Sequence, residues 1–197
     1  MTTARLLFDV MGTLVYDPFY REVPAFLGLP FEELMRVKHP TAWAEFERGE
    51  IDEPEFFGRF FADGRAFDGP GMKHAMIDTY RWLDGMEPLV HELRGAGVEL
   101  SLFSNYPSWW RHVEERVGLS AHAEWAFVSC EHGVRKPSAR AYEAILGVIG
   151  ASANECLLID DTAVNCDRAR ELGIDAIEFS GAAALRSELE RRGVLAC

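Results

Sequence analysis

The sequence predicts an α/β fold: a doubly wound parallel sheet with a small helical subdomain inserted after the first strand. Five short apolar runs are continuous rather than alternating, which is typical of parallel strands buried on both faces. The stretches between the later runs end just before a glycine, and most of them have proline near their start, the pattern of a helix. Residues 16–84 show no strand pattern and lie after the first run, so they are predicted to form the insertion.

The five apolar runs give the predicted strands in chain order: Arg5–Val10, Val98–Phe103, Trp125–Ser129, Glu155–Ile159 and Asp175–Phe179. Helical patterns connect the later strands, and each of them stops at a glycine. They cover Pro88–Arg94, Pro107–Val117, Pro137–Leu146 and Thr162–Leu172. Strand and helix in regular alternation predict a parallel sheet covered on both faces.

The inserted segment, residues 16–84, contains helical patterns at Glu32–Lys38 and Pro54–Phe61. Aromatic side chains crowd into it: Phe19, Phe26, Phe31, Trp43, Phe46, Phe56, Phe57, Phe60, Phe61 and Tyr80. Two interpretations are open. The rings form the hydrophobic core of a small subdomain, which is the favoured interpretation, or they line a ligand site.

The charge balance limits the kinds of molecule that the protein is expected to bind. The 197 residues include 20 Lys and Arg against 32 Asp and Glu, a formal net charge of −12. Because such a surface repels a nucleic-acid backbone and an anionic membrane, we expect neither as a partner. An anionic substrate would need positive charge supplied within its site. No feature of the sequence indicates a protein partner.

Segments that would direct the chain to a membrane or out of the cell are not evident. No stretch of about 18 apolar residues is present, and the first residues reach Asp9 without the apolar run of a signal peptide. The four cysteines (Cys130, Cys156, Cys166 and Cys197) have no paired spacing, which indicates inert thiols in a reducing compartment. We therefore expect a cytoplasmic protein.

Small polar or charged residues follow four of the predicted strands. The segments are Asp9–Leu14, Ser104-Asn105, Arg135-Lys136-Pro137 and Asp160–Asn165. Ligands of open α/β sheets bind beyond the carboxyl ends of the strands, so these segments are expected to meet in one pocket. Taken singly, such an aspartate can be a turn cap, and such a lysine can be a solvated loop residue. Their recurrence after four strands favours a site.

These residue types suit displacement at an electrophilic centre. Asp9 can attack as a carboxylate nucleophile, and Lys136 can neutralise charge on the nucleophile and substrate. Thr13, Ser104 and the backbone amides after Asp9 can hold the oxygens of a transferred group. Asp160 and Asp161 facing Asp9 would repel one another unless a cation lay between them, and an oxygen-rich site of this kind suits Mg²⁺.

The order Asp9…Gly12-Thr13-Leu14, Ser104-Asn105, Lys136-Pro137 and Asp160-Asp161…Asn165 resembles the four motifs of the haloacid dehalogenase (HAD) superfamily. The resemblance implies a Rossmann-like core of residues 1–15 and 85–197 with a helical cap of residues 16–84. It implies that Asp9, Lys136 and Ser104 are catalytic. The phosphate-binding residues would be Gly12, Thr13, Ser104, Asn105 and Lys136. The Mg²⁺ ligands would be Asp9, the Met11 backbone carbonyl and Asp161, with Asp160 and Asn165 in support.

One position departs from the pattern of HAD phosphatases, which usually carry a second aspartate, two residues after the first, as general acid and base. This sequence has Met11 there. A thioether has no proton to give, and loss of a general acid typically costs about 10²–10⁴-fold in rate. Asp160 or a metal-bound water is a candidate replacement.

Several segments are similar to the plant chloroplast flavin mononucleotide (FMN) hydrolase branch of the superfamily. They are Asp9–Val15, Asp17–Phe26, Lys38-His-Pro40 and Asn105–Trp109. The similarity implies a Mg²⁺-dependent phosphatase of a small phosphorylated metabolite, with FMN as the candidate, acting through an aspartyl-phosphate on Asp9. The segment Tyr106–Trp110 would either stack on the flavin ring or pack a helix start beneath the cap.

Two other functions remain open. Met11 also suits a catalytically weak HAD-fold protein that binds a ligand or a partner. A dehalogenase-type hydrolase is less favoured, because dehalogenases need no metal and lack the paired aspartates present here as Asp160 and Asp161.

Overall fold

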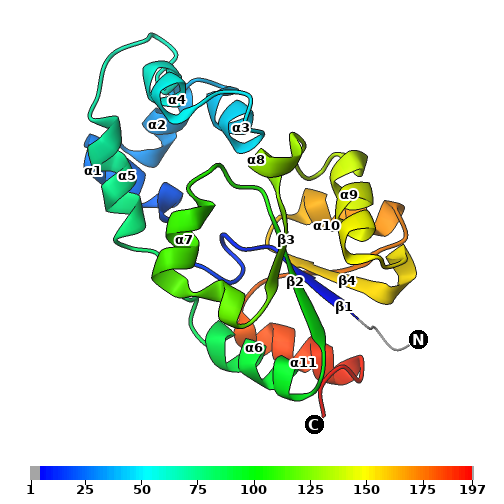
Figure 1. Cartoon of the computed structure of the whole chain (residues 1–197). Helices are drawn as coiled ribbons and strands as arrows, with labels where there is room; N and C mark the ends of the chain where they lie inside the picture. The colour runs from blue at the N-terminus through cyan, green and yellow to red at the C-terminus, as the bar shows by residue number, and fades with distance from the viewer. Residues whose placement is uncertain (1–4, 197) are drawn as a thin grey trace.

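A computed structural model describes residues 5–196 of the chain. Five parallel strands form one sheet in the order β3-β2-β1-β4-β5, with β1 in the middle (Figure 1). The strands are β1 (Arg5–Phe8), β2 (Glu99–Ser104), β3 (Glu124–Val128), β4 (Cys156–Asp160) and β5 (Asp175–Glu178). The chain builds one half of the sheet outward from β1, then crosses to β4, so the order reverses between β1 and β4.

Helices cover both faces of the sheet, as continuous apolar strands require. Leu6 and Phe8 of β1 point into a core that includes α6 (Met86–Gly95), α7 (Trp110–Val117) and α11 (Ala182–Arg191). Leu7 points the other way, into a core with α9 (Ala139–Ile149) and α10 (Ala163–Glu171). The predicted doubly wound α/β fold is confirmed.

Between β1 and α6 the inserted segment folds into short helices beyond the carboxyl ends of the strands (Figure 1). Asp17, Asp52 and Asp68 cap three of them by accepting a backbone N–H, which is the usual role of aspartate at a helix start. The helices are η1 (Pro18–Tyr20), α1 (Glu22–Leu27), α2 (Phe31–Val37), α3 (Ala42–Glu47), α4 (Glu53–Arg59) and α5 (Gly69–Ile77).

The inserted segment and the sheet share one hydrophobic cluster. At its centre lies Trp109, 1% exposed, at the start of α7. Rings of the inserted segment lie 5.2–6.0 Å from the Trp109 ring, centroid to centroid: Trp43, Phe46, Phe56 and Phe57. Most aromatic side chains of the segment therefore form core, and Trp109 packs a helix start beneath it.

The element boundaries differ from the predicted ones where a turn begins early. β1 ends at Phe8 and not at Val10, because the Val10 carbonyl accepts the N–H groups of Leu14 and Val15 in a turn. The helix predicted from Pro107 begins at Trp110. α11 was not predicted. The remaining elements are short helices: η2 (Leu119–Ala121), α8 (Ser129–His132) and η3 (Ala153–Glu155). Within residues 5–196, no helix is long and apolar enough to span a membrane.

Candidate active site

A cavity of about 390 Å³ lies between the inserted segment and the carboxyl ends of the strands. It sits where the strand order reverses, the expected place for a ligand in an open α/β sheet. Six of the predicted site residues line it: Asp9, Met11, Asn105, Lys136, Asp161 and Asn165. Its volume falls in the range of sites for small molecules and cofactors.

Asp9 and Lys136 form the floor of the site. The Asp9 N–H donates to the Ile159 carbonyl at 2.9 Å, which continues the β1–β4 pairing and sets Asp9 beside Asp160. The Lys136 Nζ donates to Asp9 Oδ1 at 2.8 Å and to Asp160 Oδ2 at 2.6 Å. Because Lys136 is fully buried, its charge serves these two carboxylates and not solvent.

Burial and charge act against each other in this group. Burial raises the pKa of Asp9 to about 8; the Lys136 ammonium lowers it, and the carboxylates of Asp160 and Asp161 raise it. Burial lowers the pKa of Lys136, but Asp160 and Asp9 outweigh that effect and raise it above its usual range. Lys136 therefore stays charged, while Asp9 needs more positive charge nearby to be ionised at neutral pH.

Asp160 and Asp161 have different environments. Asp160 is buried and accepts from Lys136, from the Thr162 N–H at 2.9 Å and from the Asn165 amide at 3.0 Å and 3.1 Å. Asp161 lines the cavity. A Cβ at Gly12 would lie 2.3 Å from Asp161 Oδ2, so the loop after β1 passes directly against this carboxylate.

The site offers the oxygen ligands that Mg²⁺ prefers. One oxygen from each of Asp9, Asp160 and Asp161 lies within 4.8 Å of the others. Among the described residues, no N–H donates to the Met11 carbonyl, so that oxygen is free to ligate. The donor set, two or three carboxylates and one carbonyl, fits a hard divalent cation.

The predicted phosphate-binding residues fall into two groups. Asn105 lines the cavity, but its amide is engaged with the backbone of Lys136, donating to the carbonyl at 3.0 Å and accepting from the N–H at 2.8 Å. Thr13 is buried and donates to Asp9 Oδ2 at 3.3 Å. Ser104 is buried, and its hydroxyl has no hydrogen-bond partner within residues 5–196. Neither Thr13 nor Ser104 belongs to the cavity wall.

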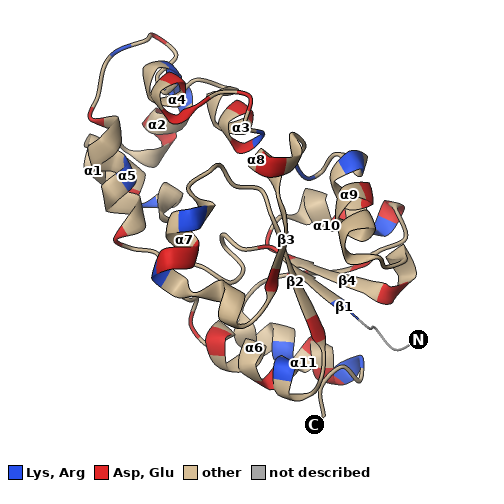
Figure 2. Ribbon diagram, in the orientation of Figure 1, with Lys and Arg blue, Asp and Glu red and all other residues tan. Residues whose placement is uncertain are grey.

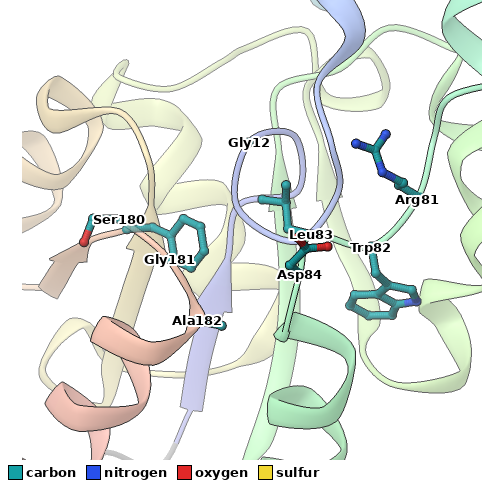
Figure 3. Close-up of a pocket in the computed structure, with 9 residues that line it drawn as sticks. Gly12, Arg81, Trp82, Leu83, Asp84, Ser180, Gly181 and Ala182 are labelled. Carbon is teal, nitrogen blue, oxygen red and sulfur yellow. The ribbon is translucent and has the colours of Figure 1, made fainter.

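Gly12 faces a second cavity, of about 420 Å³, on the far side of its loop (Figure 3). That cavity is formed by Arg81–Asp84, which lead from the inserted segment to α6, and by Phe179–Ala182 before α11. Figure 3 shows the loop of Gly12 passing beside Leu83 and Asp84. Gly12 has φ +82°, a conformation that favours glycine.

The inserted segment contributes cavity residues that sequence reasoning did not assign: Asp17, Tyr20, Met35, Lys38 and Glu47. Two of its rings, Phe19 and Trp43, for which a ligand site was the alternative interpretation, also line the cavity. Glu47 is buried; its carboxylate accepts from Trp43 Nε1 at 2.8 Å and lies 2.8 Å from Arg135 Nε in an ion pair. Burial raises the pKa of Glu47 to about 7, although Arg135 lowers it. The signal available in the sequence was the spacing of four residues between Trp43 and Glu47, which places both on one face of a helix.

Tyr106 and His39 belong to segments in which the sequence is similar to the FMN hydrolase branch, and the structure places them differently. Tyr106 lines the cavity and its hydroxyl lies 2.7 Å from the Tyr80 hydroxyl, so this ring belongs to the site while Trp109 does not. His39 turns toward the start of α3, where its Nδ1 accepts the Ala42 N–H at 3.1 Å.

The chain matches a known protein family. A family model described as haloacid dehalogenase-like hydrolase matches residues 4–173. The chain belongs to this family. It is a hydrolase, and the resemblance found in its motifs is confirmed.

Named relatives agree with the assignment. The chain is 43% identical over 189 residues to flavin mononucleotide hydrolase 1, a chloroplast protein of Arabidopsis thaliana, covering 96% of this chain and 77% of that protein. It is 28% identical to a sesquiterpene phosphatase of Aspergillus oryzae, with 94% of each chain covered. A magnesium complex of a HAD-family enzyme from Bacteroides thetaiotaomicron has the same fold, with a TM-score of 0.78, 23% identity, and 97% and 100% of the two chains covered.

Proposed function

We propose that this HAD-family hydrolase is a Mg²⁺-dependent phosphatase of a small phosphorylated metabolite, with FMN as the candidate substrate. The observation that carries the proposal is the Asp9 carboxylate held 2.8 Å from a fully buried Lys136 at the floor of a cavity. The relative of 43% identity is named for FMN hydrolysis. The Bacteroides enzyme has also been crystallised with magnesium and inorganic phosphate together.

In this proposal Asp9 attacks the phosphorus and carries the phosphoryl group as an aspartyl-phosphate, which water then hydrolyses. Lys136 offsets the negative charge of the nucleophile and of the phosphoryl oxygens. Asp160 holds Lys136 in place, and Asn165 in turn holds Asp160. Asp9, the Met11 carbonyl and Asp161 would hold Mg²⁺, which supplies positive charge to Asp9 and to the transferred group.

The residues of the cavity wall suit a flat, anionic substrate. Trp43, Phe19 and Tyr106 contribute rings, and Lys38 contributes a cation from the inserted segment. A flavin is a planar ring that stacks on aromatic faces, and its phosphate needs cations in an otherwise acidic protein. The catalytically weak binding protein that Met11 suggests would use the same cavity and differ only in turnover. We also propose a reducing compartment such as the cytoplasm, because the cysteines have no paired spacing in the sequence.

Activity should depend on the metal. FMN hydrolysis should require Mg²⁺, and removal of the ion by a chelator should lower the rate about 10²-fold or more, because a Lewis acid supplies several kcal/mol. Asp161→Asn should weaken Mg²⁺ binding, measured by calorimetry, together with activity. Val164→Ala, which shortens an apolar side chain of the same wall, is the control and should leave Mg²⁺ affinity unchanged. Equal Mg²⁺ affinity in the wild type and Asp161→Asn would contradict the assignment.

A further inference from the structure

An alkyl phosphate such as FMN leaves as a strongly basic alkoxide unless a proton reaches the leaving oxygen. Met11 cannot give that proton. The other acids of the site have other partners: Asp160 accepts from three neighbouring residues, Glu47 accepts from Trp43 and forms an ion pair with Arg135, and Asp161 is assigned to the metal. The remaining question is which carboxyl group of the cavity has an oxygen to spare.

Asp17 has one. It is the cap of η1, and its Oδ1 accepts the Phe19 N–H at 2.9 Å. Within residues 5–196, no donor reaches its Oδ2. Asp17 lines the same cavity as Asp9, Met11 and Asp161. One oxygen therefore fixes the carboxyl group while the other is available to a ligand, which is the arrangement that a proton donor needs.

On the basis of the function proposed above, we propose that Asp17 is the general acid and base that Met11 does not supply. In the first step a bond forms between an Asp9 oxygen and phosphorus, the bond from phosphorus to the leaving oxygen breaks, and the Asp17 carboxyl gives its proton to that oxygen. In the second step water attacks the phosphorus, the Asp9–phosphorus bond breaks, and the Asp17 carboxylate takes the proton of the water. The ester and water thus become alcohol and phosphate.

The surroundings of Asp17 suit this exchange. Burial raises the pKa of Asp17 to about 6; the Phe19 N–H lowers it, and the carboxylates of Asp161 and Glu22 raise it. An acid near neutrality can be protonated for the first step and ionised for the second. The other titratable groups that feel its charge belong to η1, α3 and the turns after α5 and β2: Tyr20, Glu47, Tyr80 and Tyr106. Lys38 is the cation of the inserted segment on this wall.

The test compares two esters in the first turnover with saturating Mg²⁺. FMN has an alkoxide leaving group, and p-nitrophenyl phosphate has a weakly basic phenolate that needs no proton. Asp17→Asn keeps the shape and the acceptor for the Phe19 N–H but cannot give a proton. Release of riboflavin in the first turnover should fall about 10²–10⁴-fold. The burst of nitrophenolate should change less than about tenfold, followed by slow turnover as the phosphoenzyme accumulates.

Asp52→Asn is the matched control, because Asp52 also caps a helix of the inserted segment by accepting an N–H at 2.9 Å but lies outside the cavity. It should leave both first turnovers unchanged. Asp17→Ser, which retains a capping oxygen, should repeat the split if Asp17→Asn folds poorly. An equal loss on both esters, or no loss on FMN, overturns the role of Asp17 while the phosphatase stands. If the wild type hydrolyses neither ester, the proposed function is wrong and the role of Asp17 falls with it.

Discussion

At the scale of residues, the site depends on very close approaches. Lys136 is the clearest case, since a fully buried ammonium is tolerable only when it is paired, and here it bridges Asp9 and Asp160. Gly12 is another. Its backbone has φ +82° and passes so near Asp161 that a methyl group would overlap the carboxylate at 2.3 Å. The glycine therefore lets Asp161 reach the cavity.

Gly12→Ala should accordingly damage the metal site as well as the fold. The positive φ alone costs about 1–3 kcal/mol for a residue with a side chain. The added contact should also displace Asp161 and weaken Mg²⁺ binding. Gly150→Ala is the matched control, because Gly150 has φ +62° and open space around it. Urea unfolding should show both variants destabilised, whereas calorimetry should show weaker Mg²⁺ binding in Gly12→Ala only. Unchanged Mg²⁺ affinity in Gly12→Ala would contradict this account of the loop.

At the scale of elements, the sequence predicted the sheet better than the insertion. Continuous apolar runs and glycine stops located all five strands and four of the helices, because burial on both faces leaves a strong local signal. α11 was missed, although its amphipathic pattern continues the alternation of strand and helix. The cavity residues of the inserted segment could not be predicted from the sequence. Asp17, Lys38 and Glu47 come together only through the packing of several short helices around Trp109. Tertiary contacts of that kind carry no period in the sequence.

The meeting of the motifs that follow the strands could be predicted from the topology of the sheet. Parallel strands bring their carboxyl ends to one edge, so Asp9, Lys136 and Asp161 had to meet once the strand order was right. The finer contacts were not readable. Nothing in the sequence shows that Asn105 holds the Lys136 backbone, or that Ser104 lies outside the cavity wall. Their predicted roles in phosphate binding stay predictions.

At the scale of the whole molecule, negative charge is abundant and spread widely. Acidic and basic residues are interspersed along the outer helices and the inserted segment (Figure 2), with 32 Asp and Glu against 20 Lys and Arg. Two of these acids are buried and hold their protons more tightly than exposed acids do, because burial raises the pKa of Asp9 to about 8 and that of Glu47 to about 7. The folded protein therefore binds more protons near neutrality than the unfolded chain does.

The pKa values of Asp9 and Glu47 are higher in the folded state, so their contribution to stability is present at low pH and is lost as pH rises through about 7 to 8. The midpoint temperature of thermal unfolding, measured in chelator, should decrease as pH rises from about 7 to 8.5. In this range His122, whose pKa is lowered by burial, is already largely neutral. Mg²⁺ binds ionised carboxylates and should restore stability by about 2.7 kcal/mol at 100 times its dissociation constant. A larger effect of Mg²⁺ at pH 6 than at pH 8 would contradict the assignment.

The central claim is that the phosphoryl group passes through Asp9, and chemical trapping tests it most directly. Enzyme mixed with FMN and Mg²⁺ is quenched during turnover and treated with borohydride, which reduces an aspartyl-phosphate to homoserine, and the modified peptide is located by mass spectrometry. We predict reduction at position 9 alone, dependent on FMN and Mg²⁺, and no turnover in Asp9→Asn, whose amide is a poor nucleophile of nearly the same shape. Reduction at another aspartate, or sustained hydrolysis of FMN by Asp9→Asn, would show that the phosphoryl group never reaches this residue.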